Sequence, residues 1–286
     1  MKKYALPILI LFLIFIAFYF IFISKTSQSP PNLLKVKNGI TKVLQNIDSD
    51  LKEASQKIAK TGLKSSETSK ILLELCKDHP YAMDCVTISP DGIITLIEPA
   101  KYKKSEGANI SNQPHIIKLK KTEAPLISSA FEAVEGFLAI VFQYPIFTEE
   151  HKLAGALSMI LNPNIFINEI TKPIIQDSPV DVWIMQADGI IIYDPDETEI
   201  GRNLFTDKLY QPFKELLEIG NKIIKTEKGV GVYNFFQKGF SKTISKRVYW
   251  TSLKYKECDW KIIMTLPVEK NTSAKRTIKD LGIKSL

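Results

Sequence analysis

Cysteine and histidine are scarce in this sequence, and their scarcity limits the metal chemistry that the chain could support. The 286 residues include three cysteines and three histidines, and no two cysteines stand in a Cys-x-x-Cys pair. Because the histidines are far apart in the sequence, a structural zinc site is not expected. Cys76 and Cys85 are close enough to form a disulfide in an oxidising compartment; the alternative is two small buried side chains.

The sequence also lacks the short motifs that carry common catalytic chemistry. It contains no Gly-x-Ser-x-Gly, no His-Glu-x-x-His, no phosphate-loop glycine motif and no dinucleotide-binding fingerprint. Asp194 and Asp196 are explained as turn residues. The net charge is +7, but the lysines are dispersed and form no basic stripe with interleaved aromatics. We therefore expect a protein that is not an enzyme, needs no cofactor and binds no nucleic acid.

One long apolar run is present, at the N-terminus. Ala5 to Ile23 is a stretch of 19 uncharged residues, which as a helix spans about 28 Å, close to the thickness of the hydrocarbon core. The run is followed by no small-x-small cleavage site, so a membrane anchor is favoured over a cleaved signal peptide. Lys2 and Lys3 before the run are balanced by Lys25 and other lysines after it, so charge leaves the orientation open.

An apolar stripe after a short linker predicts a long helix. Val36, Ile40, Val43, Ile47, Leu51, Ala54 and Ile58 recur at spacings of three and four, and Gly62 is the expected stop. The stripe fits a helix that packs along the rest of the chain. It also fits a stalk that pairs with a second copy of the chain.

Further helices and strands are expected where apolar residues recur. In the first half, a helix is expected over residues 66–76 and strands over 83–88, 93–97, 137–146 and 153–161. The polar, lysine-rich residues 99–125 are expected to be mostly loop. A connecting helix is expected over 165–175. In the second half, strands over 180–186, 190–193, 231–236, 247–255 and 260–266 surround a helix over 205–219.

The same order of turn, loop, helix and strands occurs in both halves. Asp91-Gly92 and Asp188-Gly189 lie 97 residues apart, each between two apolar runs, as a tight hairpin requires. Each hairpin is followed by a Gly-x-Asn, at residues 107–109 and 201–203. This order predicts an internal duplication. Strands in runs around few helices predict an α+β fold with antiparallel sheets.

A long helix followed by two such modules resembles the double Cache family of extracytoplasmic sensor domains. The most specific stretches are residues 188–196, 200–204, 231–233 and 260–263 of the second half. The resemblance implies two PAS-like antiparallel sheets beside one long helix, on the extracytoplasmic side of the membrane. The expected segments are residues 1–24 for the anchor, 25–64 for the linker and long helix, 65–162 for the membrane-distal module, 163–268 for the membrane-proximal module and 269–286 for a polar tail.

The resemblance places the ligand pocket in the membrane-distal module. Many amino-acid-binding relatives carry an arginine and an aspartate that clamp the ligand, but this sequence has Gln113 and Ile160 or a neighbour at the matching positions. Losing both charges would cost several kcal/mol of recognition, so a free α-amino acid is not expected. The remaining candidate ligand-binding residues are polar and mostly neutral; they are Tyr102, Asn112, Gln113, His115, Ser128 and Tyr144.

The sequence therefore predicts a single-pass plasma-membrane protein whose C-terminal part is an extracytoplasmic small-molecule sensor. It shows no kinase, cyclase or chemotaxis output module, so a separate signalling protein is the expected partner, with a homodimer through the long helix as a further expectation. The alternatives are a cell-surface interaction module without catalysis, or a fragment of a longer chemoreceptor or sensor kinase.

Overall fold

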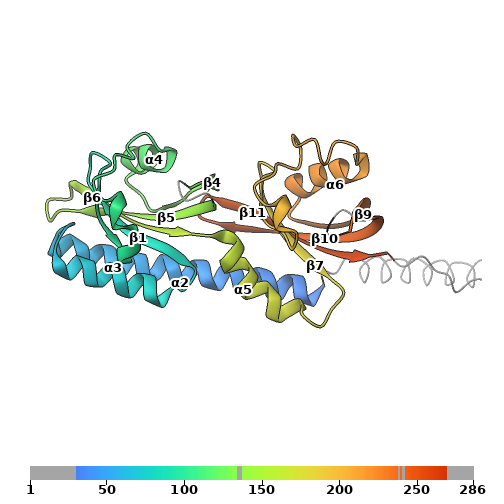
Figure 1. Cartoon of the computed structure of the whole chain (residues 1–286), viewed down its shortest axis with the longest axis horizontal. Helices are drawn as coiled ribbons and strands as arrows, with labels where there is room; N and C mark the ends of the chain where they lie inside the picture. The colour runs from blue at the N-terminus through green and yellow to red at the C-terminus, as the bar shows by residue number, and fades with distance from the viewer. Residues whose placement is uncertain (1–29, 134–136, 238, 240–241, 269–286) are drawn as a thin grey trace, which may run out of the picture.

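The fold is α+β, with two antiparallel sheets lying side by side along one long helix (Figure 1). The structure, a computed structural model, describes residues 30–133, 137–237, 239 and 242–268. The expected membrane anchor and polar tail lie outside these residues. Within the described part of the chain, no helix has both the length and the apolar character that crossing a membrane requires.

The long helix is α2, Pro31–Thr61, which confirms the expected helix. Pro31 occupies its first turn, where a missing N–H costs little, and Gly62 ends it with a φ of 81° that favours glycine. Its apolar stripe is buried, and α2 contacts strands of both sheets. The stripe is therefore used within the chain, as a helix packed along the domain requires. The buried residues of the helix are Leu33, Val36, Ile40, Leu44, Ile47, Leu51, Ala54, Ser55 and Ile58.

The first module comprises residues 66–161 and contains a six-stranded sheet. Its strand order is β2-β1-β6-β5-β3, with β4 pairing with β5 off this path, and all described pairs are antiparallel. Its elements are α3 (Ser66–Asp78), β1 (Ala82–Ile88), β2 (Ile94–Glu98), η1 (Ala100–Ser105), α4 (Pro114–Thr122), β3 (Leu126–Ile127), β4 (Phe131–Glu132), β5 (Leu138–Phe147) and β6 (Leu153–Leu161).

The second module comprises residues 181–267 and follows the connecting helix α5, Pro163–Ile175. Its sheet has the order β8-β7-β11-β10-β9, which repeats the first order element for element. The repeat extends to the loops, because Ile93 bridges to Asn109 and Ile190 bridges to Asn203 in the same way. Its elements are β7 (Asp181–Gln186), β8 (Ile191–Tyr193), η2 (Glu197–Glu199), α6 (Lys214–Lys225), β9 (Lys228–Phe236), β10 (Thr243–Tyr255) and β11 (Cys258–Pro267).

Two expectations were wrong in detail. Residues 99–125, expected to be mostly loop, contain η1 and α4; the lysines of α4 face solvent while His115, Ile116 and Leu119 are buried. The helix expected over residues 205–219 begins only at Lys214, because the preceding residues form turns held by Asn203 and Asp207 side chains. In both places, short polar side chains and lysines made it hard to recognise from the sequence where the helix lies.

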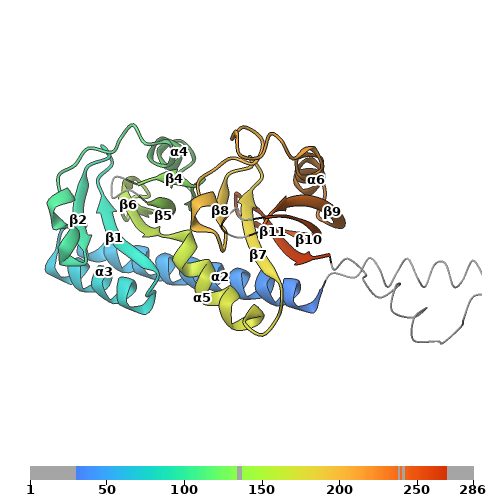
Figure 2. The same ribbon diagram turned by 45° about the vertical axis from the view of Figure 1, so that its right-hand side comes forward.

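The sheets are covered on both faces. One face of the first sheet packs on α2 and α3, and one face of the second packs on α2 and α5; the largest apolar cluster lies there and draws on both modules. The other face is covered by α4 in the first module and by α6 in the second, each over its own smaller cluster (Figure 2). The helix-covered faces are therefore separate in the two modules, whereas the α2 face is shared.

Candidate functional site

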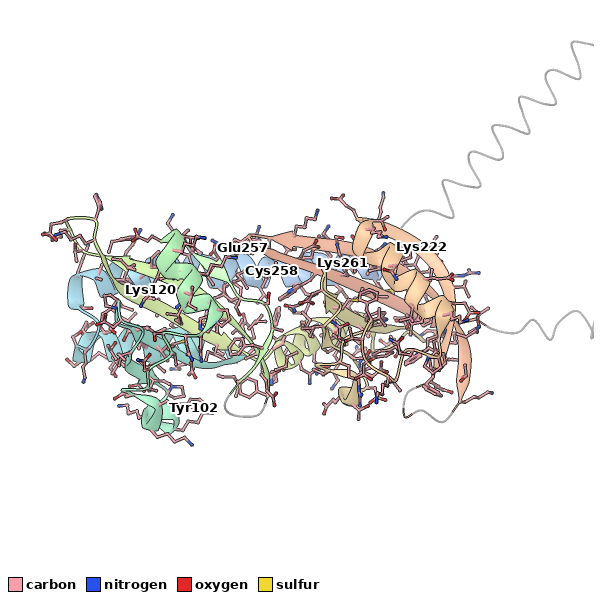
Figure 3. The ribbon with its side chains drawn as sticks, turned by 90° about the horizontal axis from the view of Figure 1, so that it is seen from above. Tyr102, Lys120, Lys222, Glu257, Cys258 and Lys261 are labelled. Carbon is pink, nitrogen blue, oxygen red and sulfur yellow. The ribbon has the colours of Figure 1, made fainter. Side chains whose placement is uncertain are left out.

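A groove of about 730 Å³ lies where the two modules meet. We call it the inter-module groove. The first module contributes the start of α4 and residues 126–132, and the second contributes the β7–β8 turn and residues 257–260 around the β10–β11 turn. Figure 3 shows Glu257 and Cys258 of that turn between the two modules. A concave site of this size between two packed units is where small ligands commonly bind.

His115 is a buried titratable group of the inter-module groove, as is Cys258. His115 is 7% exposed, and its ring lies 5.5 Å from that of Phe131, measured between centroids. Burial lowers the pKa of His115 to about 4, so the ring is neutral at pH 7. Its nitrogens form no hydrogen bond with any residue that the structure describes. A neutral imidazole offers a ligand one N–H donor and one acceptor.

Contacts across the groove hold the modules together. Lys118 of α4 forms an ion pair with Glu257 of the β10–β11 turn. The side-chain oxygen Oε1 of Gln186, on β7, accepts a hydrogen bond from the backbone N–H of Ala130 at 2.7 Å. Asp188 adds a carboxylate to the second-module side of the groove. The groove is therefore lined by carboxylates and by Lys118, which is already paired with Glu257.

The structure brings together half of the predicted ligand-binding residues. Gln113, His115 and Ser128 all line the inter-module groove. Ser128 is partly committed, because its Oγ accepts the backbone N–H of Val141 at 2.9 Å. These residues lie close together because α4 forms, with Gln113 at its N-cap and His115 in its first turn.

The other three lie elsewhere. Tyr102 is in η1, at the outer side of the first module (Figure 3), where the Lys101 ammonium lies 4.7 Å from the centroid of its ring. Asn112 is exposed on the loop before α4. Tyr144 points to the opposite face of the sheet, where its hydroxyl donates to Asp48 of α2.

The cysteines are free thiols in the structure. Cys85 is fully buried and lies within hydrogen-bonding reach of Cys76, and burial raises its pKa. A disulfide between them therefore stays a prediction for an oxidising compartment. Among the described residues, no group of three or more side chains could hold a metal ion.

Sequence reasoning missed the contribution of the second module to the groove. Glu257 and Trp260 line it from the second module, but they lie more than a hundred residues from Phe131 of the first module and share no motif with it. It also missed Gln143 and Ser158, which face each other across β5 and β6 and are buried without a hydrogen-bond partner among the described residues. Both residues lie on strands that are buried along nearly their whole length, so no alternation of apolar and polar residues marks their positions.

Residues 42–163 match the family model described as HK/GC/Chemotaxis protein-like, sensor domain. An extracellular ligand binding receptor from Desulfohalobium retbaense DSM5692 is structurally similar, with a TM-score of 0.69 and 26% identity over 82% of this chain. The match covers 39% of that receptor, so this chain spans about two fifths of its length. No curated protein matches the sequence.

Two further solved structures share the fold. The ligand-binding domain of the amino acid chemoreceptor PctB of Pseudomonas aeruginosa PAO1, in complex with L-Arg, gives a TM-score of 0.58 at 14% identity, over 89% of this chain and 92% of that one. The periplasmic sensory domain of the Campylobacter jejuni chemoreceptor Tlp1 gives a TM-score of 0.55 at 16% identity, over 87% of this chain and 95% of that one.

Proposed function

We propose that this chain carries an extracytoplasmic ligand-binding sensor domain of the double Cache type and that its ligand binds in the inter-module groove. The observation that carries the proposal is the buried, neutral His115 beside Phe131 in a groove of about 730 Å³. A hydrogen-bonding group without a protein partner in such a place is expected to meet a ligand. The role is recognition, without catalysis.

The proposed ligand is a small polar molecule other than a free α-amino acid. PctB binds an amino acid, but the described lining of this groove has Lys118 as its one cation, and Lys118 is paired with Glu257. Clamping a zwitterion would require breaking that pair or leaving the ligand carboxylate without a partner. Gln113, His115 and Ser128 instead supply neutral donors and acceptors.

The groove is well placed to influence α2. Lys256, next to Glu257, forms an ion pair with Asp48 of α2 at 2.7 Å. The same carboxylate accepts hydrogen bonds from Tyr144 of the first module and Tyr255 of the second. A ligand that shifts the β10–β11 turn would therefore act on α2, the long helix that contacts both sheets.

The anchor and the partners belong to the proposal as well. We propose that residues 5–23 hold the chain in the plasma membrane and that a separate signalling protein, or a second copy of this chain, receives the signal. The described start of α2 and the end of β11 lie at the same end of the molecule (Figure 1), so both would face the membrane from the second module. Because the apolar stripe of α2 is buried in the chain, a dimer would use the polar face of the helix.

Thermal unfolding of the full chain against a panel of metabolites tests the proposal. A ligand at 100 times its dissociation constant should stabilise the protein by about 2.7 kcal/mol. His115→Phe, which keeps an aromatic ring but removes both nitrogens, should abolish the response, while Asn112→Ala should leave it unchanged because Asn112 lies outside the groove. A response that survives His115→Phe would place the ligand elsewhere.

A further inference from the structure

The second module has a pocket of its own, separate from the inter-module groove. A cavity of about 40 Å³, room for roughly three water molecules, lies between the sheet and the segment that joins β8 to α6. Aromatic walls come from the sheet, through Trp183 of β7 and Tyr233 and Phe235 of β9. Three carboxylates line the side of the joining segment, those of Asp194, Asp196 and Glu199.

Two of these carboxylates, Asp194 and Glu199, have unused hydrogen-bonding capacity. Asp194 accepts the backbone N–H of Asp196 at 2.7 Å through Oδ1, and its Oδ2 has no hydrogen-bond partner among the described residues. Glu199 accepts the hydroxyl of Tyr210 at 2.9 Å through Oε2. Within the part of the chain that the structure describes, neither carboxylate forms an ion pair.

A second, independent observation points into the same cavity. Thr265 of β11 lines it and is 2% exposed, yet its hydroxyl makes no hydrogen bond with any described residue. Buried hydroxyls normally have a partner, and one that lacks it within the protein is satisfied by a bound molecule. The unpartnered atoms of Thr265, Asp194 and Glu199 thus come from two different segments and line one cavity.

Carboxylates outnumber cations in the cavity. Its lining includes one lysine, Lys246, and four carboxylates, those of Asp181, Asp194, Asp196 and Glu199. Burial raises the pKa of Asp194 and of Glu199, while the charge of Lys246 opposes the rise at both. Among the described residues Lys246 forms no ion pair with either of them; its ammonium lies 5.6 Å from the centroid of Phe235, and the nearby Arg202 pairs with Asp207.

We propose that this pocket binds a small organic ammonium ion, of about two or three heavy atoms given its size. Asp194 and Glu199 accept its N–H groups, Thr265 supplies a further oxygen, and its carbon atoms pack against Trp183 and Tyr233 as aromatic rings pack against organic cations. A hard metal ion is a poorer fit, because it takes six or more oxygen ligands. The site is distinct from the inter-module groove and adds a second ligand class to the proposed sensor.

Titration calorimetry of the full chain with ethylammonium chloride tests this proposal. The controls are potassium chloride at equal ionic strength and ethanol, which has the same size but no charge. We expect saturable binding of ethylammonium and none of the controls. Asp194→Asn should weaken binding by about tenfold or more, because it removes a charge-assisted hydrogen bond while its oxygen still accepts from Asp196.

Two further variants keep the result interpretable. Thr265→Val, which has the same shape without the hydroxyl, should weaken binding several-fold and covers the case in which Asp194→Asn fails to fold. Asp188→Asn changes a carboxylate of the inter-module groove and should leave ethylammonium binding unchanged. Equal binding of potassium, absence of ethylammonium binding, or binding that survives both Asp194→Asn and Thr265→Val would each overturn the proposal.

Discussion

The two modules share a strand order but fill the space under their covering helices differently. Under α4, apolar side chains such as Val86, Ile116 and Leu119 pack against the sheet and leave a cavity of about 10 Å³, enough for one water molecule. Under α6, the corresponding space is about 40 Å³ and is lined by carboxylates and aromatic rings. A shared topology therefore does not bring a shared pocket chemistry.

The difference extends to the buried titratable groups. His115 of the first module has a lowered pKa and Asp194 of the second has a raised one, and burial is the main cause in both. Burial thus disfavours the charged form in both modules, that of a base, His115, in the first and that of an acid, Asp194, in the second. The two modules should consequently depend on pH in opposite directions.

The largest expected effect follows from the face that the modules share. Trp260 is 1% exposed in the apolar cluster that joins α2 to both sheets, and its ring lies 6.2 Å from that of Phe166. Trp260→Ala should lower the free energy of unfolding by about 3–5 kcal/mol. All three tryptophans are in the second module, so fluorescence of Trp183 and Trp250 still reports on it in the variant.

Denaturant titrations followed by that fluorescence and by far-ultraviolet circular dichroism check this prediction. Because the shared cluster couples the modules, both signals should change in one transition, in the native sequence and in the variant. Two separate transitions in the native sequence would mean that the modules unfold independently, and the comparison would then concern two domains.

The next largest effect is the pH dependence of His115. Its folded pKa of about 4 is below its ordinary value of 6.5, so the unfolded state binds the proton more readily between these values. Stability from the neutral ring is present above pH 6.5 and is lost as pH falls towards 4, by about 3 kcal/mol in total. His115→Gln should remove this loss. Its unfolding free energy, measured from pH 4 to 8, should therefore fall less steeply in acid.

Asp194→Asn is the matched variant in the second module. The raised pKa of Asp194 means that ionising it costs stability as pH rises above its ordinary pKa of 3.8, through the folded pKa. Asp181, Asp196, Glu199, Tyr233 and Lys246 face the same carboxylate and modulate the slope. Asp194→Asn should gain stability relative to the native sequence towards pH 8. If both substitutions changed the pH dependence of the unfolding free energy in the same direction, the contrast between the modules would be wrong.

Much of the fold could be predicted from the sequence because it rests on local signals. The stripe of α2, Gly62 at its end and the two Asp-Gly turns each follow from the spacing or the conformational freedom of a few residues. The antiparallel repeat followed from their order. The family resemblance added the long helix beside two sheets, and the comparisons bear it out.

The site could be predicted only in part because it rests on non-local contacts. Gln113, His115 and Ser128 were found through a loop of the resembled family, but Glu257 reaches the groove through the β10–β11 turn, 139 residues from its partner Lys118. Tyr144 was predicted from its side-chain type. Its strand position, one residue from Gln143, turns it to the α2 face instead.

A smaller effect on the free energy of unfolding is expected at the two buried glutamines, Gln143 and Gln186, and it should differ in sign between them. Gln143 of the first module is fully buried and neither of its amide atoms has a hydrogen-bond partner among the described residues, whereas Gln186 of the second holds Ala130. Gln143→Leu should raise the free energy of unfolding by about 1–3 kcal/mol, because it removes unsatisfied polar atoms at similar volume. Gln186→Leu should lower it, since the N–H of Ala130 would lose its partner. Chemical denaturation measures both; loss of stability in Gln143→Leu would indicate that Gln143 meets a bound water or ligand.

The smallest expected effect on the free energy of unfolding concerns Asp48, a side chain of α2 that contacts both modules. Asp48 accepts hydrogen bonds from Tyr144 and Tyr255 and pairs with Lys256, and burial with the bond to Asp48 raises the pKa of Tyr255 to about 12. Asp48→Ala should lower the free energy of unfolding by about 1–2 kcal/mol. Hydrogen exchange should speed up on β5 and on β10 together, because the carboxylate joins both strands to the helix.

Asp50, two residues along the same helix, is the matched control. Its side chain is 48% exposed and, among the described residues, hydrogen-bonds to the first module, through the buried His79 at 3.0 Å. A single hydrogen bond contributes about 1 kcal/mol, so Asp50→Ala should cost about that and should speed exchange in the first module alone. If Asp48→Ala also changed exchange in one module only, α2 would hold the modules separately. A ligand in the groove would then lack this route from the β10–β11 turn to the helix.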